Sequence, residues 1–341
     1  MMGKLIRIAL FLCLLSSSIL GQDMHYSQFY AAPLYLNPAF AGSTELSRVG
    51  LNYRKQWPGL AHDFNMFSAY FDHYSYDMKS GFGVAFNSFH ETNMDLKMNE
   101  VSFFYSYKLT LSEGWDMRFG GQGALVMRNA ALDNLLFGDQ INLFTQTINP
   151  NTMDNVPEFD PYSYFDVSFG TLLQGQNVWM GTSMHHMNTP SLSFFPDNDQ
   201  NLLPMKWSIH GGANFGLGSN NYFGSNGENM ASLAFNYKRQ GPFQQLDVAG
   251  QLLYGSFIGG LSFRGIPGLR GNANQDSLIL LLGLKFENGL VVGYSYDFMI
   301  SNVGVQTRGA HEISLRYQFL LGDPRSRDRR SRVLRCFDYL L

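Results

Sequence analysis

Short segments of alternating apolar and polar residues recur along most of this chain, and beyond the first twenty residues no stretch is long and apolar enough for a membrane-spanning helix. In the segment 101–110 every second residue is apolar or aromatic, namely Val101, Phe103, Tyr105, Tyr107 and Leu109. A period of two predicts a β-strand. One face suits lipid and the other suits water, and because lipid cannot satisfy open backbone groups, such a sheet must close on itself. The pattern therefore predicts an all-β fold, a transmembrane antiparallel β-barrel.

The number and spacing of these segments predict about fourteen strands, an even number as in bacterial single-chain barrels. The expected strands cover residues 46–56, 64–72, 80–88, 97–109, 115–129, 163–173, 178–186, 205–215, 230–238, 245–253, 257–263, 277–286, 290–300 and 310–320. With both chain ends in the periplasm, the long connections 130–162, 187–204 and 264–276 face outside and most of the inner connections are tight turns. That asymmetry is typical of outer-membrane barrels. Residues 46–320 are therefore predicted to form one barrel.

The first 21 residues are typical of a secretory signal peptide. Lys4 and Arg7 precede an apolar run over residues 8–15, and small and polar residues follow up to Gly21. The apolar run is too short for a membrane-spanning helix, which needs about 20 residues. We therefore expect cleavage between Gly21 and Gln22 and residence of the remaining chain in the cell outer membrane.

Cysteine and charge usage exclude several classes of protein. Cys13 lies in the signal peptide and Cys336 near the C-terminus, so the exported chain has no cysteine pair for a disulfide or a cysteine-based metal site. The formal charge of −3 divides into +2 for residues 1–21, +3 for the arginine-rich residues 321–341 and −8 for the body between them. An acidic body argues against nucleic acid as a partner. We expect residues 321–341 to form a basic, solvated C-terminal tail on the periplasmic side.

Charged residues of both signs occur on the polar face of the expected strands. They are Arg48, Arg54, Lys108, Asp116, Arg118, Asp166, Lys206, Lys238, Asp247, Lys285, Asp297, Glu312 and Arg316. Since a basic residue at the midplane of the lipid face costs about 2–4 kcal/mol, these side chains are expected to point into the lumen. Two interpretations stay open: ion pairs that brace or plug the lumen, and ordinary side chains of a water-filled lumen.

Motifs for catalysis, cofactors and metals are missing from the sequence. Its eight histidines lack metal-ligand spacing, and the adjacent His185 and His186 are expected to point to opposite faces of a strand. No nucleophile elbow, phosphate-binding loop or dinucleotide fingerprint occurs. Glycine clusters such as Gly120, Gly121 and Gly123 lie within strands, where close backbone approach or barrel curvature accounts for them. We therefore predict no catalytic residue, no cofactor and no metal, in a protein that is not an enzyme.

The segment that precedes the first expected strand, residues 25–42, is dense in aromatic residues and contains two prolines. Such a segment is unfavourable in water, so we expect it to be packed, and the barrel lumen is the nearest place. Fully extended, ~21 residues reach roughly 70 Å, enough to enter a barrel ~25 Å tall. Residues 22–45 are therefore predicted to form an N-terminal plug or strap, as in FadL-like barrels.

A set of residues in and after this segment resembles the opening signature of a known family. The signature residues are Ser27, Gln28, Phe29, Pro33, Leu34, Tyr35, Leu36, Asn37, Pro38, Gly42, Asn52, Tyr53, Arg54, Gln56, Trp57 and Pro58. They look like the start of the PorP/SprF family of type IX secretion system membrane proteins, and weaker similarity continues at residues 71–72, 81–83 and 311–315. The chain departs from the family pattern in its arginine-rich ending and in the long segment 130–162.

The resemblance implies an outer-membrane protein of the Bacteroidota that works with the translocon for exported adhesins and enzymes, including adhesins of gliding motility. It implies as partners a secreted protein, bound through its C-terminal signal domain, other type IX secretion components in the periplasm or outer membrane, and membrane lipid. It brings no catalytic residues. The first hypothesis is therefore a non-enzymatic accessory that assists export, surface attachment or both for a specific secreted protein such as an adhesin.

Two other functions stay open on the sequence. A FadL-like outer-membrane channel for a hydrophobic small molecule needs an apolar lumen, whereas the inward residues expected here are charged. An outer-membrane enzyme needs a Ser–His or paired-carboxylate arrangement at the barrel rim, and no spacing singles one out. For the first hypothesis, aromatic residues of the outer loops are candidate anchors for a bound protein: Trp57, Phe144, Phe194 and Phe195.

Overall fold

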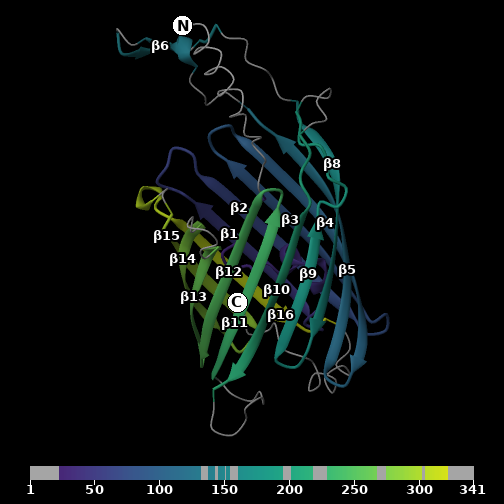
Figure 1. Ribbon diagram of the computed structural model, residues 1–341. Coiled ribbons are helices and arrows are strands. Elements are labelled where there is room, and N and C mark those ends of the chain that lie inside the picture. The colour runs from purple at the N-terminus through teal and green to yellow at the C-terminus, as the bar shows by residue number, and fades with distance from the viewer. Residues whose placement is uncertain are drawn as a thin grey trace, which may run out of the picture.

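Fourteen antiparallel strands form one closed barrel (Figure 1), which confirms the predicted fold class. The structure is a computed structural model that describes residues 23–131, 137–142, 145–149, 151–153, 160–194, 201–217, 229–266, 274–301 and 304–321. The predicted signal peptide, the tail beyond Leu321, and the proposed anchors Phe144 and Phe195 lie outside the described residues. In the part that is described, no helix combines the length and apolar character that crossing a membrane requires.

The barrel strands follow chain order, each hydrogen-bonded to the one before it, and the last closes on the first. Their bounds are β1 Ser47–Gln56, β2 Phe64–Ser75, β3 Ser80–Glu91, β4 Leu96–Ser112, β5 Trp115–Asn129, β8 Tyr162–Gln174, β9 Val178–His185, β10 Lys206–Gly216, β11 Asn229–Gln240, β12 Phe243–Tyr254, β13 Phe257–Ile266, β14 Asn274–Lys285, β15 Leu290–Met299 and β16 Ala310–Phe319. A separate hairpin of β6 (Ile141–Asn142) and β7 (Thr147–Ile148) lies in the connection between β5 and β8.

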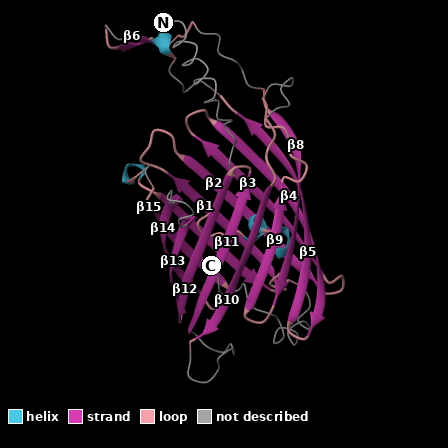
Figure 2. Ribbon diagram, viewed as in Figure 1, coloured by secondary structure: helices cyan, strands magenta, loops and turns pink. Residues whose placement is uncertain are grey.

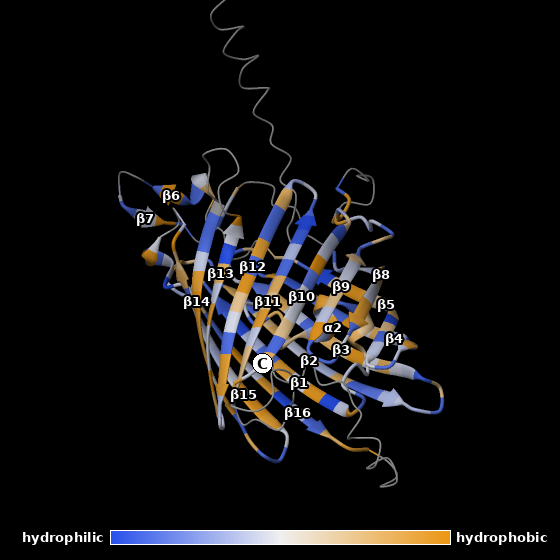
Figure 3. Ribbon diagram, turned by 60° about the horizontal axis from the view of Figure 1, so that its bottom comes forward, coloured by the Kyte–Doolittle hydropathy of each residue, from blue (hydrophilic) through white to orange (hydrophobic). Residues whose placement is uncertain are grey.

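Side chains alternate between the lumen and the outer surface, as a period of two requires. In β1, Asn52 and Arg54 are buried, while Leu51 and Tyr53 are exposed. Figure 3 shows the resulting alternation of hydrophilic and hydrophobic bands along the strands. The exposed set is rich in Phe, Leu and Tyr, which suits contact with hydrocarbon, and the lumen set is largely polar.

The connections at the two ends of the barrel differ in length. One end carries the short turns 113–114, 175–177 and 255–256 and one longer connection, 217–228, while the other carries the long connections after β5 and β9. Short turns face the periplasm in this class of barrel, so the end with the long connections is the outer end. The predicted outer connection 264–276 was too long: a β-bulge at Arg264 and Gly265 lets the ladder continue, so β13 reaches Ile266 and β14 begins at Asn274.

The described residues that precede β1, from Asp23 to Leu46, lie in the lumen. They include the short helix α2 (Pro33–Leu36) and the 3-10 helix η1 (Pro38–Phe40), drawn in cyan inside the barrel in Figure 2. Each helix begins with proline. Proline suits the first helical position because a backbone N–H there would have no partner within the helix, so its absence costs nothing. Phe40 is fully buried and packs edge-on against Trp179 of the wall, with ring centroids 5.5 Å apart.

Candidate functional site

The segment from Asp23 to Glu45, which we call the plug, runs through the lumen from the outer to the inner end. At the outer end, the backbone N–H of Asp23 donates to Gln240 Oε1 at 3.0 Å. At the inner end, the backbone N–H of Gly42 donates to Asp72 Oδ2 at 2.7 Å. The plug therefore occupies the lumen over most of its height and delivers the chain to the inner edge, where β1 starts.

Three wall glycines form the seat on which the plug backbone rests, and we call Gly81, Gly120 and Gly170 the glycine seat. An ideal Cβ would lie 2.0 Å from Ala41 O at Gly81, 2.2 Å from Ala39 N at Gly120, and 1.9 Å from Asn37 Oδ1 at Gly170. No side chain fits at such distances, so the close approach of plug and strand requires glycine. Gly121, next to the seat, has open space where a Cβ would stand.

Asn37 fixes the middle of the plug to the wall. Its side-chain oxygen accepts the backbone N–H of Ala39 at 2.8 Å and so caps η1. Its amide nitrogen donates to the backbone oxygens of Thr171 and Thr182, at 2.9 and 3.1 Å, and lies 3.0 Å from His210 Nε2. One signature side chain therefore contacts polar groups of the plug and of three neighbouring strands, β8, β9 and β10.

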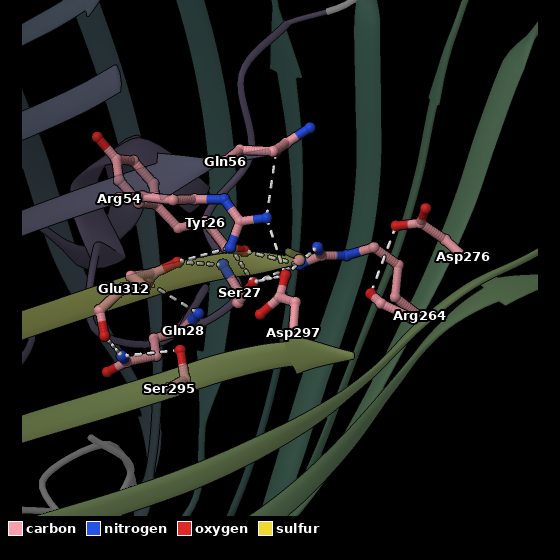
Figure 4. Close-up of polar contacts among 12 residues, drawn as sticks. Tyr26, Ser27, Gln28, Arg54, Gln56, Arg264, Asp276, Ser295, Asp297 and Glu312 are labelled. Carbon is pink, nitrogen blue, oxygen red and sulfur yellow. Dashed lines mark hydrogen bonds and ion pairs between the residues drawn. The ribbon is translucent and has the colours of Figure 1, made fainter. Parts of the chain in front are cut away.

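A buried ionic network binds the first turn of the plug to four strands (Figure 4). Asp297 Oδ2 lies 2.8 Å from Arg54 Nη2 and 3.1 Å from Arg264 Nη1. The hydroxyl of Ser27 donates to Asp297 at 2.6 Å and accepts from both arginines. Glu312 accepts the backbone N–H of Ser27 at 2.6 Å. Three of the predicted lumen charges, Arg54, Asp297 and Glu312, are thus paired around a plug residue.

Gln28 extends this network along β15 and β16. Its backbone N–H donates to Glu312 Oε1 at 3.0 Å, and its side-chain nitrogen donates to Ser295 Oγ at 3.1 Å. Its side-chain oxygen accepts from Ser314 Oγ at 2.6 Å. Sequence distances of more than 260 residues separate these partners, so barrel closure creates the site.

A second set of ion pairs holds the inner end of the plug. Arg48 Nε lies 2.8 Å from Asp72 Oδ1, and both side chains are fully buried. Glu45 pairs with Lys108 and lies 3.5 Å from Arg118 Nη2. These contacts favour the interpretation in which lumen charges brace the plug over that of a simple water-filled lumen.

At the outer end Asp23 forms a latch with three wall residues, His186, Lys206 and Gln240. Asp23 Oδ2 lies 2.7 Å from His186 Nε2 and 2.6 Å from Lys206 Nζ, and Asp23 Oδ1 accepts from Gln240 at 3.0 Å. The prediction that His185 and His186 face opposite sides of a strand was wrong. β9 ends at His185, and His186 has a positive φ of 58°, which turns its ring toward Asp23 and Asp166.

The latch predicts loss of stability at alkaline pH. Burial opposes charge on His186, but the carboxylates of Asp23 and Asp166 outweigh it and raise the pKa of His186 to about 9. Burial likewise opposes charge on Asp23, yet His186 and Lys206 hold the pKa of Asp23 well below its usual value. The His186 contribution, at most about 3 kcal/mol, is therefore complete below its unfolded pKa of ~6.5 and disappears as the pH rises through 9.

Thermal unfolding at pH 7.5 and pH 10 measures this effect. The wild-type chain is expected to lose more stability between these pH values than the His186→Gln variant, because other lysines and tyrosines titrate alike in both. Equal losses in the two proteins would contradict the assignment of the latch.

Two cavities open between the plug and the outer half of the wall, and we name each after a lining residue. The Glu100 cavity encloses about 1020 Å³ of space between atoms and the Lys238 cavity about 620 Å³, in both cases with space that is open to solvent. Both are lined by Asp23, Tyr35, His185 and Lys206, among others, so they adjoin across the latch. The described residues include no group of three or more His, Cys, Asp or Glu arranged to hold a metal ion.

The signature residues divide into three groups in space. Ser27, Gln28, Asn37, Gly42, Asn52, Arg54 and Gln56 make hydrogen bonds in or around the plug. Phe29, Pro33, Leu34, Tyr35, Leu36 and Pro38 form the body of the plug, most of them buried. The remaining three lie elsewhere: Tyr53 is exposed on the outer surface of the barrel, and Trp57 and Pro58 lie just beyond the outer end of β1.

Several residues of the site were not singled out from the sequence. Arg264 was assigned to an outer loop, and Asp23 and Glu45 to the ends of the plug without partners. Of the glycine seat, Gly120 was explained only by close approach or curvature, Gly81 was noted only for its similarity to the family pattern, and Gly170 was not singled out. The alternation in β13 contained a signal for Arg264, because Ser262 and Arg264 share the polar face.

The profile of the family described as "Type IX secretion system membrane protein PorP/SprF" matches residues 19–317, nearly the whole chain. The chain belongs to the PorP/SprF family. This confirms the resemblance noted from the signature residues and makes the chain a type IX secretion system membrane protein with an outer-membrane β-barrel fold. No curated protein matches the sequence.

Solved structures similar to this PorP/SprF chain are outer-membrane barrels of low sequence identity. A Pseudomonas aeruginosa FadL homologue has 11% identity and a TM-score of 0.46, covering 83% of this chain and 93% of its own. The CymD monoaromatic hydrocarbon channel has 10% identity and a TM-score of 0.45, with coverage of 85% and 93%. Acinetobacter baumannii Omp33 has 7% identity and a TM-score of 0.43, with coverage of 82% and 100%.

Proposed function

We propose that the protein is a non-enzymatic outer-membrane accessory of type IX secretion that assists export, surface attachment or both for a specific secreted protein such as an adhesin. The observation that carries the proposal is a plug held at both ends and in the middle in a chain of the PorP/SprF family. A lumen filled in this way suits a protein that holds its cargo at a surface. Its partners are then a secreted protein, bound through its C-terminal signal domain, and the secretion machinery.

The outer end of the barrel offers surfaces that suit contact with a protein. Ile141 and Ile148 of the β6–β7 hairpin are 45% and 58% exposed, and Val305 in another outer connection is 85% exposed. Apolar groups beyond the strand ends favour protein contact when a partner covers them. Of the described anchor candidates, Trp57 packs against Phe64, and Phe194 packs against Tyr162. A neighbouring aromatic ring therefore holds each of the two candidates in position.

Deletion of the gene tests this function. Mass spectrometry of the cell exterior is expected to show loss of one or a few surface proteins, with recovery when the wild-type chain is supplied. Supply of the Gly121→Leu chain is the matched control, since its added side chain meets open space. An unchanged set of surface proteins in the deleted strain would contradict the proposal.

A second candidate function is a channel for a hydrophobic small molecule. The size of the Glu100 cavity and the aromatic and aliphatic side chains in its lining favour this candidate. It requires the plug to move, whereas the contacts at both ends of the plug hold it in place. A growth defect confined to one small nutrient, with surface proteins unchanged, is the result that supports the channel.

A further inference from the structure

The Lys238 cavity lies directly beneath the outer rim of the barrel. One side is the start of the plug, and the other is the inner face of β10, β11 and β12. Gly241 and Pro242 turn the chain from β11 to β12 just above it. It encloses about 620 Å³ of space between atoms, part of which is open to solvent at the rim. A ligand from outside therefore meets this cavity before it meets the body of the plug.

Lys238 brings a positive charge into this cavity without a partner. Its side chain is on the lumen face of β11, in register with Ser208 of β10 and Gln245 of β12. Among the residues that the structure describes, none is within hydrogen-bond or ion-pair distance of its ammonium group. The nearby carboxylates are engaged elsewhere, Asp247 with Arg264 at 2.8 Å and Asp23 with Lys206 at 2.6 Å.

A second polar group of the cavity also lacks a partner. Asn236, two residues before Lys238 on the same face, is buried, and its side-chain oxygen accepts no hydrogen bond from any described residue. A buried acceptor without a donor costs about 1–3 kcal/mol unless a bound molecule satisfies it. Burial, together with Arg264 and Lys238, lowers the pKa of His25, which leaves a neutral imidazole beside the lysine.

The rest of the lining combines apolar or aromatic side chains with polar ones, among them the paired Asp23 and Lys206 and three glutamines, Gln240, Gln244 and Gln245. The apolar or aromatic ones include Tyr26, Phe29 and Leu36 of the plug and Phe243 of β12. A ligand that fits this lining has an apolar body, one negative charge for Lys238 and a neighbouring N–H donor for Asn236. The C-terminal residue of a peptide combines these features, since its carboxylate and its amide N–H are attached to the same carbon.

We propose that the Lys238 cavity binds the C-terminal apolar residue of a peptide chain, with the carboxylate on Lys238 and the amide N–H on Asn236. The proposal deepens the proposed function, on which it rests, because it assigns a place on the barrel to the end of a secreted chain. It adds a binding site for a stated chemistry in the outer half of the lumen.

Calorimetric titration of the full-length protein in neutral detergent tests the site, with acetyl-leucyl-phenylalanine as the probe. The free acid is expected to bind at least about tenfold more tightly than the corresponding amide, which corresponds to about 1.4 kcal/mol. 3-Phenylpropionate, which has the carboxylate and the ring but no N–H, is expected to bind more weakly than the acid. Binding of 3-phenylpropionate as tight as that of the peptide acid would overturn the peptide assignment.

The Lys238→Met variant is expected to lose the preference for the acid, and Arg239→Gln is the matched control. Arg239 is one residue away and exposed, so its removal changes the same charge outside the cavity. Absence of saturable binding, equal binding of acid and amide, or unchanged binding in Lys238→Met would overturn the proposal. The acid and amide comparison on the wild-type chain needs no variant, so a Lys238→Met chain that fails to fold leaves the test intact.

Failure of this inference is distinguishable from failure of the proposed function. If the peptide acid does not bind but gene deletion removes surface proteins, the secretion role stands without this site. If the acid binds and deletion leaves the surface proteins unchanged, the site stands and the secretion role is wrong.

Discussion

Leucine in place of Gly120 and Gly170 is expected to push the plug away from the barrel wall. At both positions a Cβ alone would lie closer than 2.5 Å to plug atoms, and the rest of a leucine side chain has no space. Overpacking costs typically about 1–3 kcal/mol at each site. Each strand is held by hydrogen-bond ladders on both sides, whereas the plug is not part of the sheet. We therefore expect the plug, and not the strands, to be displaced.

Hydrogen exchange measured by mass spectrometry shows the displacement directly. The plug amides of the double variant are expected to exchange at least about tenfold faster than in the wild type, while the strand amides stay protected. Planar-bilayer recordings are expected to show an ion current that the wild-type chain lacks. The control is Gly121→Leu, which adds the same side chain to the lipid-facing side of β5 and is expected to leave both measurements unchanged. Equal exchange in the double variant and this control would show that the glycines do not seat the plug.

Replacement of Asp297 by asparagine is expected to be the most destabilising single change in the lumen. Asp297 is fully buried. Its carboxylate forms ion pairs with Arg54 and Arg264 and accepts a hydrogen bond from the hydroxyl of Ser27. Loss of its charge removes the carboxylate that the two buried guanidinium groups share and leaves Arg54 with Glu312 at 3.4 Å and Arg264 with Asp247 at 2.8 Å. Breaking a buried pair by removing one partner costs about 3–5 kcal/mol. Urea unfolding of the protein in lipid vesicles, followed by tryptophan fluorescence, measures the change in the free energy of unfolding.

A matched control removes one carboxylate charge from an exposed position. Glu113 lies in the short turn between β4 and β5, and its replacement by glutamine is expected to change the free energy of unfolding by less than about 0.5 kcal/mol. If Asp297→Asn costs no more than this control, the network does not hold the plug and its charges are hydrated like those of an open lumen.

The strands could be predicted from the sequence because each carries its own signal. In β1 and β16 the alternation of Leu51, Tyr53, Ile313 and Leu315 with polar residues depends only on the period of the strand and on which face meets lipid. The outer ends were less predictable. Hydrogen-bond ladders of β13 continue past Arg264 through a bulge, and such a bulge interrupts the alternation on which the prediction depends.

The partners of the plug could not be predicted, because they depend on contacts between distant parts of the chain. Ser27 meets Glu312 only after fourteen strands have closed, and no local pattern relates two residues 285 positions apart. Composition predicted that residues 25–42 are packed. It did not predict which wall residue each of them contacts, because the backbone of this segment is irregular and has no period from which the contacts could be read. His186 illustrates the same limit, since one positive φ at the end of β9 reverses the side to which its ring points.

The central claim is that the plug is a fixed part of the barrel interior, and hydrogen exchange of the unmodified protein tests it most directly. Within residues 26–44, the amides of Ser27, Gln28, Asn37, Ala39 and Gly42 donate hydrogen bonds in the lumen. The account predicts that peptides covering this segment exchange as slowly as peptides from β1. Exchange at the rate of an unfolded peptide, with the strands still protected, would contradict it.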